Sequence, residues 1–244
     1  MSRLAMLLAL TLPTVSAPLA AQAGAARPEI FVVATLYGRH AATPAYGHDT
    51  LRAIIDRIAP RVVVLDVSPR ELRDQTVHPS KAEYPEVIFP LVRQRGYHAY
   101  AGEPDEPRFS EIVSSLSRHL EAFRDSRPEL AAIDRAHNDA TYAALAAVWD
   151  TPAEVNGALT DHLLASRRRY QDRVAGAGVA EAWRLWNDHA AAVVRRASRE
   201  NPGERVLVLI GVENAGPLRA ALAADPSVDL VDVESWLRTA GRSR

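Results

Sequence analysis

The chain has 244 residues, of which 48% are hydrophobic, and its formal net charge is -1. This length suffices for one sizeable hydrophobic core, and the near-neutral charge balance argues against a nucleic acid or an anionic membrane surface as partner. The sequence has no cysteine, which excludes disulfides and lipid attachment through a thiol.

The N-terminus has the pattern of an export signal. Arg3 supplies a positive charge, residues 4–12 form an apolar stretch, and Ala-Gln-Ala at 21–23 is a small-x-small cleavage site. We therefore expect residues 1–23 to be a signal peptide and the mature protein to be periplasmic or secreted. The alternative is a membrane anchor, but a spanning helix needs about 20 apolar residues and two prolines interrupt this stretch. No stable membrane span is expected after the signal is removed.

Apolar strands and helices alternate in the first part of the mature chain. Residues 30–36 and 62–65 are continuous apolar runs typical of strands buried on both faces. Between them a helix is predicted with Asp49 as its N-cap. Residues 85–95 are predicted to be helical, although Pro90 must kink or divide this helix. A weaker strand is predicted at residues 97–101.

Only helical periodicity is found from about residue 108 to 200, and the alternation then returns. A strand at 205–210, a helix at 217–224 and a strand at 228–233 are predicted. The pattern indicates an α/β fold with a mostly parallel sheet of about five strands flanked by helices. A long all-helical insertion separates the third and fourth strands, and residues 24–244 are expected to form a single α/β domain.

Polar residues follow the predicted strands at their carboxyl ends, where open parallel sheets bind ligands. With a strand order of 3-2-1-4-5, the order would reverse between the first and fourth strands. The residues at these ends are Tyr37, Arg39 and His40 after the first strand, Asp66 after the second, Glu103 after the third, and Glu213 and Asn214 after the fourth. The alternative is local structure, since Asn214 could cap the next helix and Asp66 could anchor a turn.

Carboxylate, imidazole and amide groups at this edge are possible ligands of a divalent cation. The candidate metal ligands are His40, Asp66, Glu213 and Asn214. The chain lacks the helical H-x-x-x-H pair of zinc sites, the G-x-S-x-G nucleophile elbow and the glycine-rich phosphate-binding loops. Nucleotide binding is therefore not favoured.

Two features of the helical block are more typical of structural roles. Arg167, Arg168 and Arg169 point in different directions around one helix, which is typical of a solvated face. Trp183 and Trp186 lie one turn apart and are interpreted first as core residues and second as residues that stack on a ligand.

The strand ends resemble those of the TraB/Tiki-like superfamily, which includes the pheromone-shutdown proteins. This superfamily is distantly related to erythromycin-esterase and ChaN-like haem-binding proteins. Its pattern is an apolar strand with a G-x-x-H motif, a second strand ending in an acidic residue, and a late strand ending in G-x-x-H or G-x-x-N. The matching segments are residues 34–40 with Gly38-Arg39-His40, Val64-Leu65-Asp66, Gly211-Val212-Glu213-Asn214, and Trp186-Asn187-Asp188, which is similar to the family's R-N-type helix.

The motifs are partly degenerate. Tyr37 stands where the family has histidine, so His40 would have to replace it from three residues further along. Asp66 replaces the more usual glutamate, and Asn214 occupies the position that holds histidine or asparagine. Since Tiki-like members are metal-dependent peptidases, the resemblance implies a divalent metal such as manganese, cobalt or zinc that activates water.

Three functions compete at this stage. The first is an exported hydrolase that cleaves a peptide, amide or ester bond in a small-molecule or peptide substrate. Glu213 would be its general base, with catalytic roles for His40 and Arg39. The second is a non-catalytic binding protein that holds a small ligand through Arg39, Tyr37 and Asn214, with Asn187 as a further candidate ligand-binding residue. The third is an interaction protein that uses the helical block as its contact surface.

Overall fold

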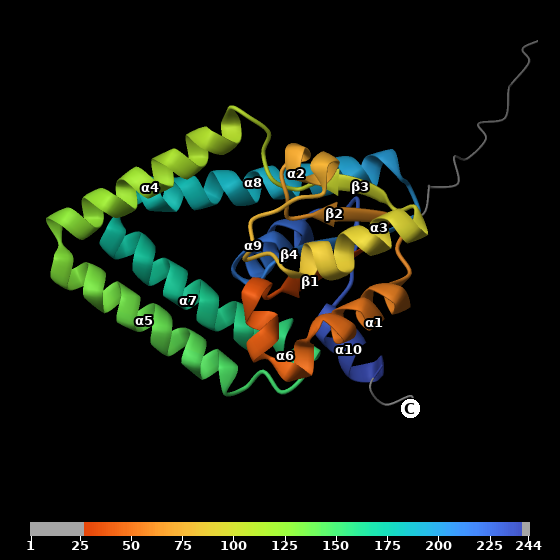
Figure 1. Ribbon diagram of the computed structural model, residues 1–244, viewed down its shortest axis with the longest axis horizontal. Helices are drawn as coiled ribbons and strands as arrows, with labels where there is room; N and C mark the ends of the chain where they lie inside the picture. The colour runs from red at the N-terminus through yellow and green to blue at the C-terminus, as the bar shows by residue number, and fades with distance from the viewer. Residues whose placement is uncertain (1–26, 241–244) are drawn as a thin grey trace, which may run out of the picture.

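The computed structural model describes residues 27–240, shown in Figure 1. The predicted signal peptide, residues 1–23, lies outside the described residues. Within 27–240, no helix is long and apolar enough to cross a membrane.

A five-stranded, all-parallel sheet forms the centre of the fold and confirms the predicted fold class. Its inner strands are apolar and almost fully buried, because helices cover both faces of the sheet (Figure 1). The strands are β1 (Glu29–Thr35), β2 (Val62–Leu65), β3 (His98–Ala101), β4 (Arg205–Gly211) and β5 (Asp229–Leu230).

The strand order is β3-β2-β4-β1-β5, so the expected order 3-2-1-4-5 is wrong. β4 lies between β1 and β2 and pairs with both of them. β1 and β4 are equally long and equally buried, and their sequences therefore did not reveal which one lies nearer the middle. The carboxyl ends of β1, β4 and β2 are therefore direct neighbours, which brings the polar residues that follow these strands together.

The predicted helices are present but differ in their ends, and the helices at 69–74 and 233–240 were not predicted. The helix after β4 begins at Val212, five residues earlier than predicted, so that Asn214 lies in its first turn instead of capping it. The last predicted strand is reduced to Asp229–Leu230. Gly47 replaces Asp49 as the N-cap of the first helix.

The helices are α1 (His48–Ile58), α2 (Pro69–Asp74), α3 (Phe89–Arg95), α4 (Arg108–Ser126), α5 (Pro128–Ala146), α6 (Pro152–Val155), α7 (Ala158–Ala175), α8 (Ala177–Glu200), α9 (Val212–Ala223) and α10 (Val233–Ala240).

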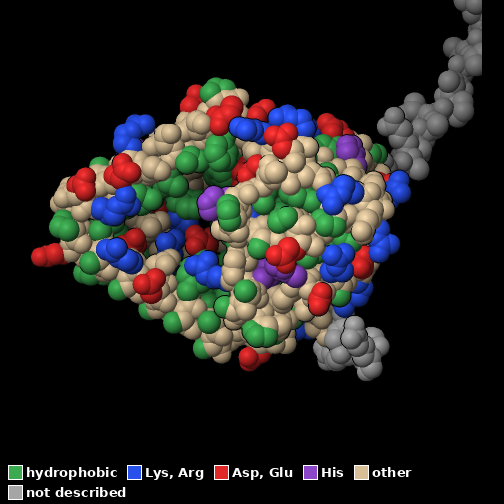
Figure 2. Space-filling view, in the orientation of Figure 1, with side chains coloured by type: hydrophobic (Ala, Val, Ile, Leu, Met, Phe, Trp, Pro, Cys, Tyr) green, Lys and Arg blue, Asp and Glu red, His purple; other side chains and the backbone are tan. Residues whose placement is uncertain are grey.

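The predicted helical insertion consists of α4 to α8. In Figure 1, α4 lies along α8 and α5 lies along α7, and the two pairs diverge where they approach the sheet. The space-filling view in Figure 2 shows the molecule hollowed between these helices and the sheet, with acidic and basic side chains inside the hollow. The insertion thus forms walls around the edge of the sheet where a ligand was expected.

A buried carboxyl group lies beneath this edge. Glu83, directly before a π-helical turn (Tyr84–Ile88), is 0% exposed, and its carboxyl oxygens have no hydrogen-bond partner among the described residues. Burial raises the pKa of Glu83 from its ordinary 4.5 to about 7, although Thr35 and His48 lie close enough to offset part of this effect. Glu83 is therefore largely protonated below neutral pH.

Candidate functional site

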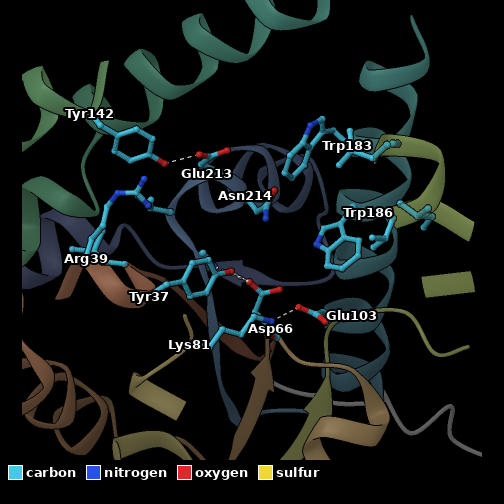
Figure 3. Close-up of a pocket in the computed structure, with 17 residues that line it drawn as sticks. Tyr37, Arg39, Asp66, Lys81, Glu103, Tyr142, Trp183, Trp186, Glu213 and Asn214 are labelled. Carbon is cyan, nitrogen blue, oxygen red and sulfur yellow. Dashed lines mark hydrogen bonds and ion pairs between the residues drawn. The ribbon is translucent and has the colours of Figure 1, made fainter. Parts of the chain in front are cut away.

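A cavity of about 380 Å³ lies at the carboxyl ends of β1, β2 and β4 (Figure 3). Polar side chains from the strand ends form its floor, and α4 and α8 contribute an apolar wall. The wall residues are Ile112, Val113, Leu116, Ala182, Trp183 and Trp186.

Tyr37 and Asp66 form the centre of the floor. The Tyr37 hydroxyl donates a hydrogen bond to Asp66 Oδ2, which also accepts the backbone N–H of Gly211 at 3.0 Å. Tyr37 adopts a left-handed backbone conformation (φ 51°), which is uncommon for a residue with a side chain and is found preferentially at functional sites. Gly211 is required here because the Tyr37 ring lies against its Cα. Burial and the Asp66 carboxylate raise the pKa of Tyr37 well above its usual value, so that Tyr37 remains a neutral donor.

Lys81 and Glu103 form an ion pair at the deep end of the floor. Lys81 Nζ also donates to the backbone oxygen of Asp66 at 2.6 Å. Burial alone would lower the pKa of Lys81, but the carboxylates of Asp66 and Glu103 outweigh it and the pKa is raised. Burial, together with the nearby Asp66, raises the pKa of Glu103. This end of the cavity thus brings two carboxyl groups close to one ammonium group.

Glu213 lies on the opposite side and is fully engaged by protein groups. Tyr142 donates to its Oε1 at 2.5 Å and Arg168 donates to its Oε2 at 2.8 Å. Arg168 also stacks 3.7 Å above the centre of the Trp183 ring. Burial lowers the pKa of Arg168 to about 10, which still leaves it charged at neutral pH. Since both carboxylate oxygens have partners, Glu213 is better suited to fixing the wall than to acting as the general base that the sequence suggested.

Asn214 and Arg39 present polar groups to the cavity that form no hydrogen bond or ion pair within residues 27–240. Asn214 is only 8% exposed, yet no described side chain or backbone group forms a hydrogen bond with its amide, and its Oδ1 is buried. The Arg39 guanidinium lies 4.0 Å above the ring of Tyr142 but forms no ion pair with a described carboxylate. Figure 3 shows both side chains directed towards the cavity. They are the groups most available to a ligand.

His40 lies outside the cavity and serves the fold. Its Nε2 accepts the Leu36 N–H at 3.0 Å and its Nδ1 lies 2.6 Å from the backbone oxygen of Tyr46, which fixes the tautomer with the proton on Nδ1. Burial lowers the pKa of His40, and the neighbouring His48 contributes in the same direction. A neutral imidazole with both nitrogens engaged holds the turn after β1 in place.

The four predicted metal ligands do not converge. His40 has no free nitrogen, and Glu213 is held by Tyr142 and Arg168 on the far side of the cavity from Asp66. Among the described residues, no group of three or more His, Asp or Glu side chains is arranged to hold a metal ion. The residues present do not fit the predicted metal centre, which stays a prediction, and no step proposed below uses a metal.

Four of the predicted site residues, Tyr37, Arg39, Asp66 and Asn214, line the cavity in positions open to a ligand. Glu213 lines it but is engaged, and Asn187 borders a second cavity behind Trp183. Lys81 and Tyr142 also line the cavity but could not be found from the sequence, because no motif distinguishes them from surface residues. Arg168 was predicted to be solvated, whereas its side chain is 17% exposed.

Comparisons with protein-family models, with curated proteins and with solved structures find no match to this chain.

Proposed function

We propose that the protein binds a small amphipathic organic acid in the cavity at the carboxyl ends of β1, β2 and β4. This proposal rests on one observation: some polar groups of the cavity bond to each other, and others have no such partner. The floor groups bond to one another, while among the described residues the buried Asn214 amide has no hydrogen-bond partner and the Arg39 guanidinium has no ion-pair partner. A buried amide without a partner costs about 1–3 kcal/mol, which a bound ligand would recover.

The apolar wall of the cavity indicates which kind of apolar group the ligand carries. Trp183 and Trp186 present aromatic surface beside Leu116 and Ile112, and a volume of about 380 Å³ is within the usual range for small-molecule sites. A planar apolar group, aromatic or conjugated, matches such a wall because it stacks on the indole rings.

The anionic group of the ligand is assigned to Arg39. This side chain is exposed at the rim of the cavity, and stacking on Tyr142 holds its guanidinium above the entrance. A guanidinium binds a carboxylate through two parallel hydrogen bonds. The ligand would therefore enter with its apolar body first and leave its acid group at the rim.

Binding of naphthalene-2-carboxylate, measured by calorimetry, tests this assignment. We expect Arg39→Ala to weaken its affinity about tenfold, because one charge-assisted pair is worth about 1.5–3 kcal/mol. The neutral isostere naphthalene-2-methanol should bind the wild type and Arg39→Ala equally, and Arg39→Lys should retain part of the affinity for the acid. Equal losses for acid and alcohol would contradict the assignment, and no binding of either compound to the wild type would contradict the proposed function.

Hydrolysis of an ester or amide bond in such a ligand is a second candidate function, favoured by one observation. No described residue donates to Asp66 Oδ1, and Figure 3 shows the Asp66 carboxylate facing the cavity. This oxygen could accept a proton from a water that attacks a carbonyl carbon, and the proton would then pass to the alkoxide or phenolate that leaves. The strained backbone at Tyr37 is also typical of catalytic sites.

Hydrolysis of 2-naphthyl acetate distinguishes the two functions. If Asp66 is the general base, Asp66→Asn should lower kcat by at least about a hundredfold while the affinity for naphthalene-2-carboxylate changes little. The control is Asp56→Asn, since Asp56 pairs with Arg95 on the surface, away from this cavity, and should not affect kcat. A wild-type rate no higher than that of Asp66→Asn would rule out the hydrolase and leave the binding function.

A further inference from the structure

A second cavity, of about 280 Å³, adjoins the first behind Trp183. It lies between α7, α8 and α9, and it shares Trp183, Val212, Glu213 and Asn214 with the first cavity. These four residues lie between the two spaces, so a ligand that fills both would have to pass beside them.

Unpaired polar atoms gather around this second cavity. Asp172 Oδ1, Asn187 Oδ1 and Asn214 Oδ1 are buried acceptors, and Trp183 Nε1 is a buried donor, and none has a hydrogen-bond partner within residues 27–240. The orientation of Asn187 is fixed, since its Nδ2 donates to the backbone oxygen of Trp183 at 2.9 Å. Buried polar groups in native proteins are rarely left unpaired, so several around one cavity indicate a polar occupant.

The charges of the lining favour a neutral occupant. Three guanidinium groups (Arg168, Arg169 and Arg184) and three carboxylates (Asp161, Asp172 and Glu213) line it, so their formal charges balance. A cation would face the guanidinium groups, and an anion such as phosphate would face the carboxylates and the amide oxygens of Asn187 and Asn214. A hydroxyl group suits both kinds of partner, because it donates to an amide or carboxylate oxygen and accepts from an indole N–H.

We infer that the second cavity is a subsite for a neutral polyhydroxylated group, of the kind found in a sugar ring, carried by the ligand whose apolar body fills the first cavity. The inference rests on the proposed function for the location of that body. Trp183 would contact both parts of the ligand, and Asn214 would lie at their junction. The protein would thus recognise a hydroxylated or glycosylated amphipathic compound.

The affinities of 2-naphthol and 2-naphthyl β-D-glucoside test this inference, since the two compounds share the apolar body and differ in the sugar. We expect the glucoside to bind the wild type about tenfold more tightly than 2-naphthol does, because the sugar adds one or two hydrogen bonds to the protein. Ala180→Leu and Ala165→Leu add bulk to the second cavity from α8 and α7 at half-buried positions. Both should remove the advantage of the glucoside and leave the affinity for 2-naphthol unchanged.

Two results would overturn the inference while leaving the proposed function intact. One is binding of 2-naphthol to the wild type with no gain from the sugar. The other is a gain that persists in both leucine variants. If neither naphthol, glucoside nor naphthalene-2-carboxylate binds the wild type, the proposed function fails and the inference fails with it.

Discussion

Gly211→Ala is expected to lower the free energy of unfolding by about 3 kcal/mol and to abolish ligand binding, because the new methyl group overpacks the floor of the cavity. The backbone at Gly211 (φ -54°, ψ 140°) suits alanine, so the cost does not come from backbone strain. The added Cβ would lie 2.7 Å from Cζ and 2.9 Å from Cε2 of Tyr37, closer than any real contact. Tyr37 would have to leave Asp66, whose carboxylate would then lose its hydroxyl donor.

Chemical denaturation measures this effect when Gly211→Ala is introduced into the wild type and into the Tyr37→Ala variant. In a Tyr37→Ala background the obstacle is absent, and the added methyl group should cost less than about 1 kcal/mol. An equal cost in both backgrounds would show that the close packing of Tyr37 on Gly211 does not determine the structure of the floor.

Glu83→Gln is expected to stabilise the protein increasingly as the pH rises from 4.5 to 8, by about 3 kcal/mol at the upper end. The pKa of Glu83 is raised to about 7 in the folded protein, so the folded state binds more protons than the unfolded state between pH 4.5 and 7. Stability of the wild type therefore falls as pH rises through this range. Glutamine resembles the protonated acid in shape and carries no charge, and it avoids this loss.

Unfolding free energies of the wild type and Glu83→Gln at pH 5 and pH 8 test this expectation. Glu111→Gln is the matched control, since its side chain is 58% exposed and only pairs with Arg108 on the surface. The control should shift stability by less than about 0.5 kcal/mol at either pH. A difference between the wild type and Glu83→Gln that is the same at both pH values would contradict the elevated pKa of Glu83.

Much of the fold could be predicted because apolar runs report burial directly. The strands at 30–36, 62–65 and 205–210 are buried on both faces, and the helical periodicity from 108 to 200 matches α4 to α8. Strand order could not be predicted, since the pairing partners of β4 are set by packing between segments far apart in the chain. The early start of α9 was hidden by Pro217, which the helix accommodates in its interior.

The site could be located more easily than its chemistry could be assigned. Tyr37, Asp66 and Asn214 follow strand ends and meet at one edge, as parallel strands require. Which of the polar groups remain free depends on partners from the helical insertion, such as Tyr142 and Arg168, and no local pattern reveals these pairs. The resemblance to TraB/Tiki-like proteins stays a prediction, and the exported location stays a prediction as well.

Binding of a small amphipathic acid in the cavity beside Trp183 and Trp186 is tested most directly by nuclear magnetic resonance. The protein has four tryptophans, and each gives one indole signal in a ¹H–¹⁵N spectrum. Trp236 packs on Phe31 at β1 and serves as an internal control outside the cavity, whereas Trp149 packs edge-on against Tyr142 of the cavity and does not. On titration with naphthalene-2-carboxylate, the signals of Trp183 and Trp186 should shift and saturate together while that of Trp236 stays in place. Unchanged Trp183 and Trp186 signals, or an equal shift of the Trp236 signal, would contradict the proposed function.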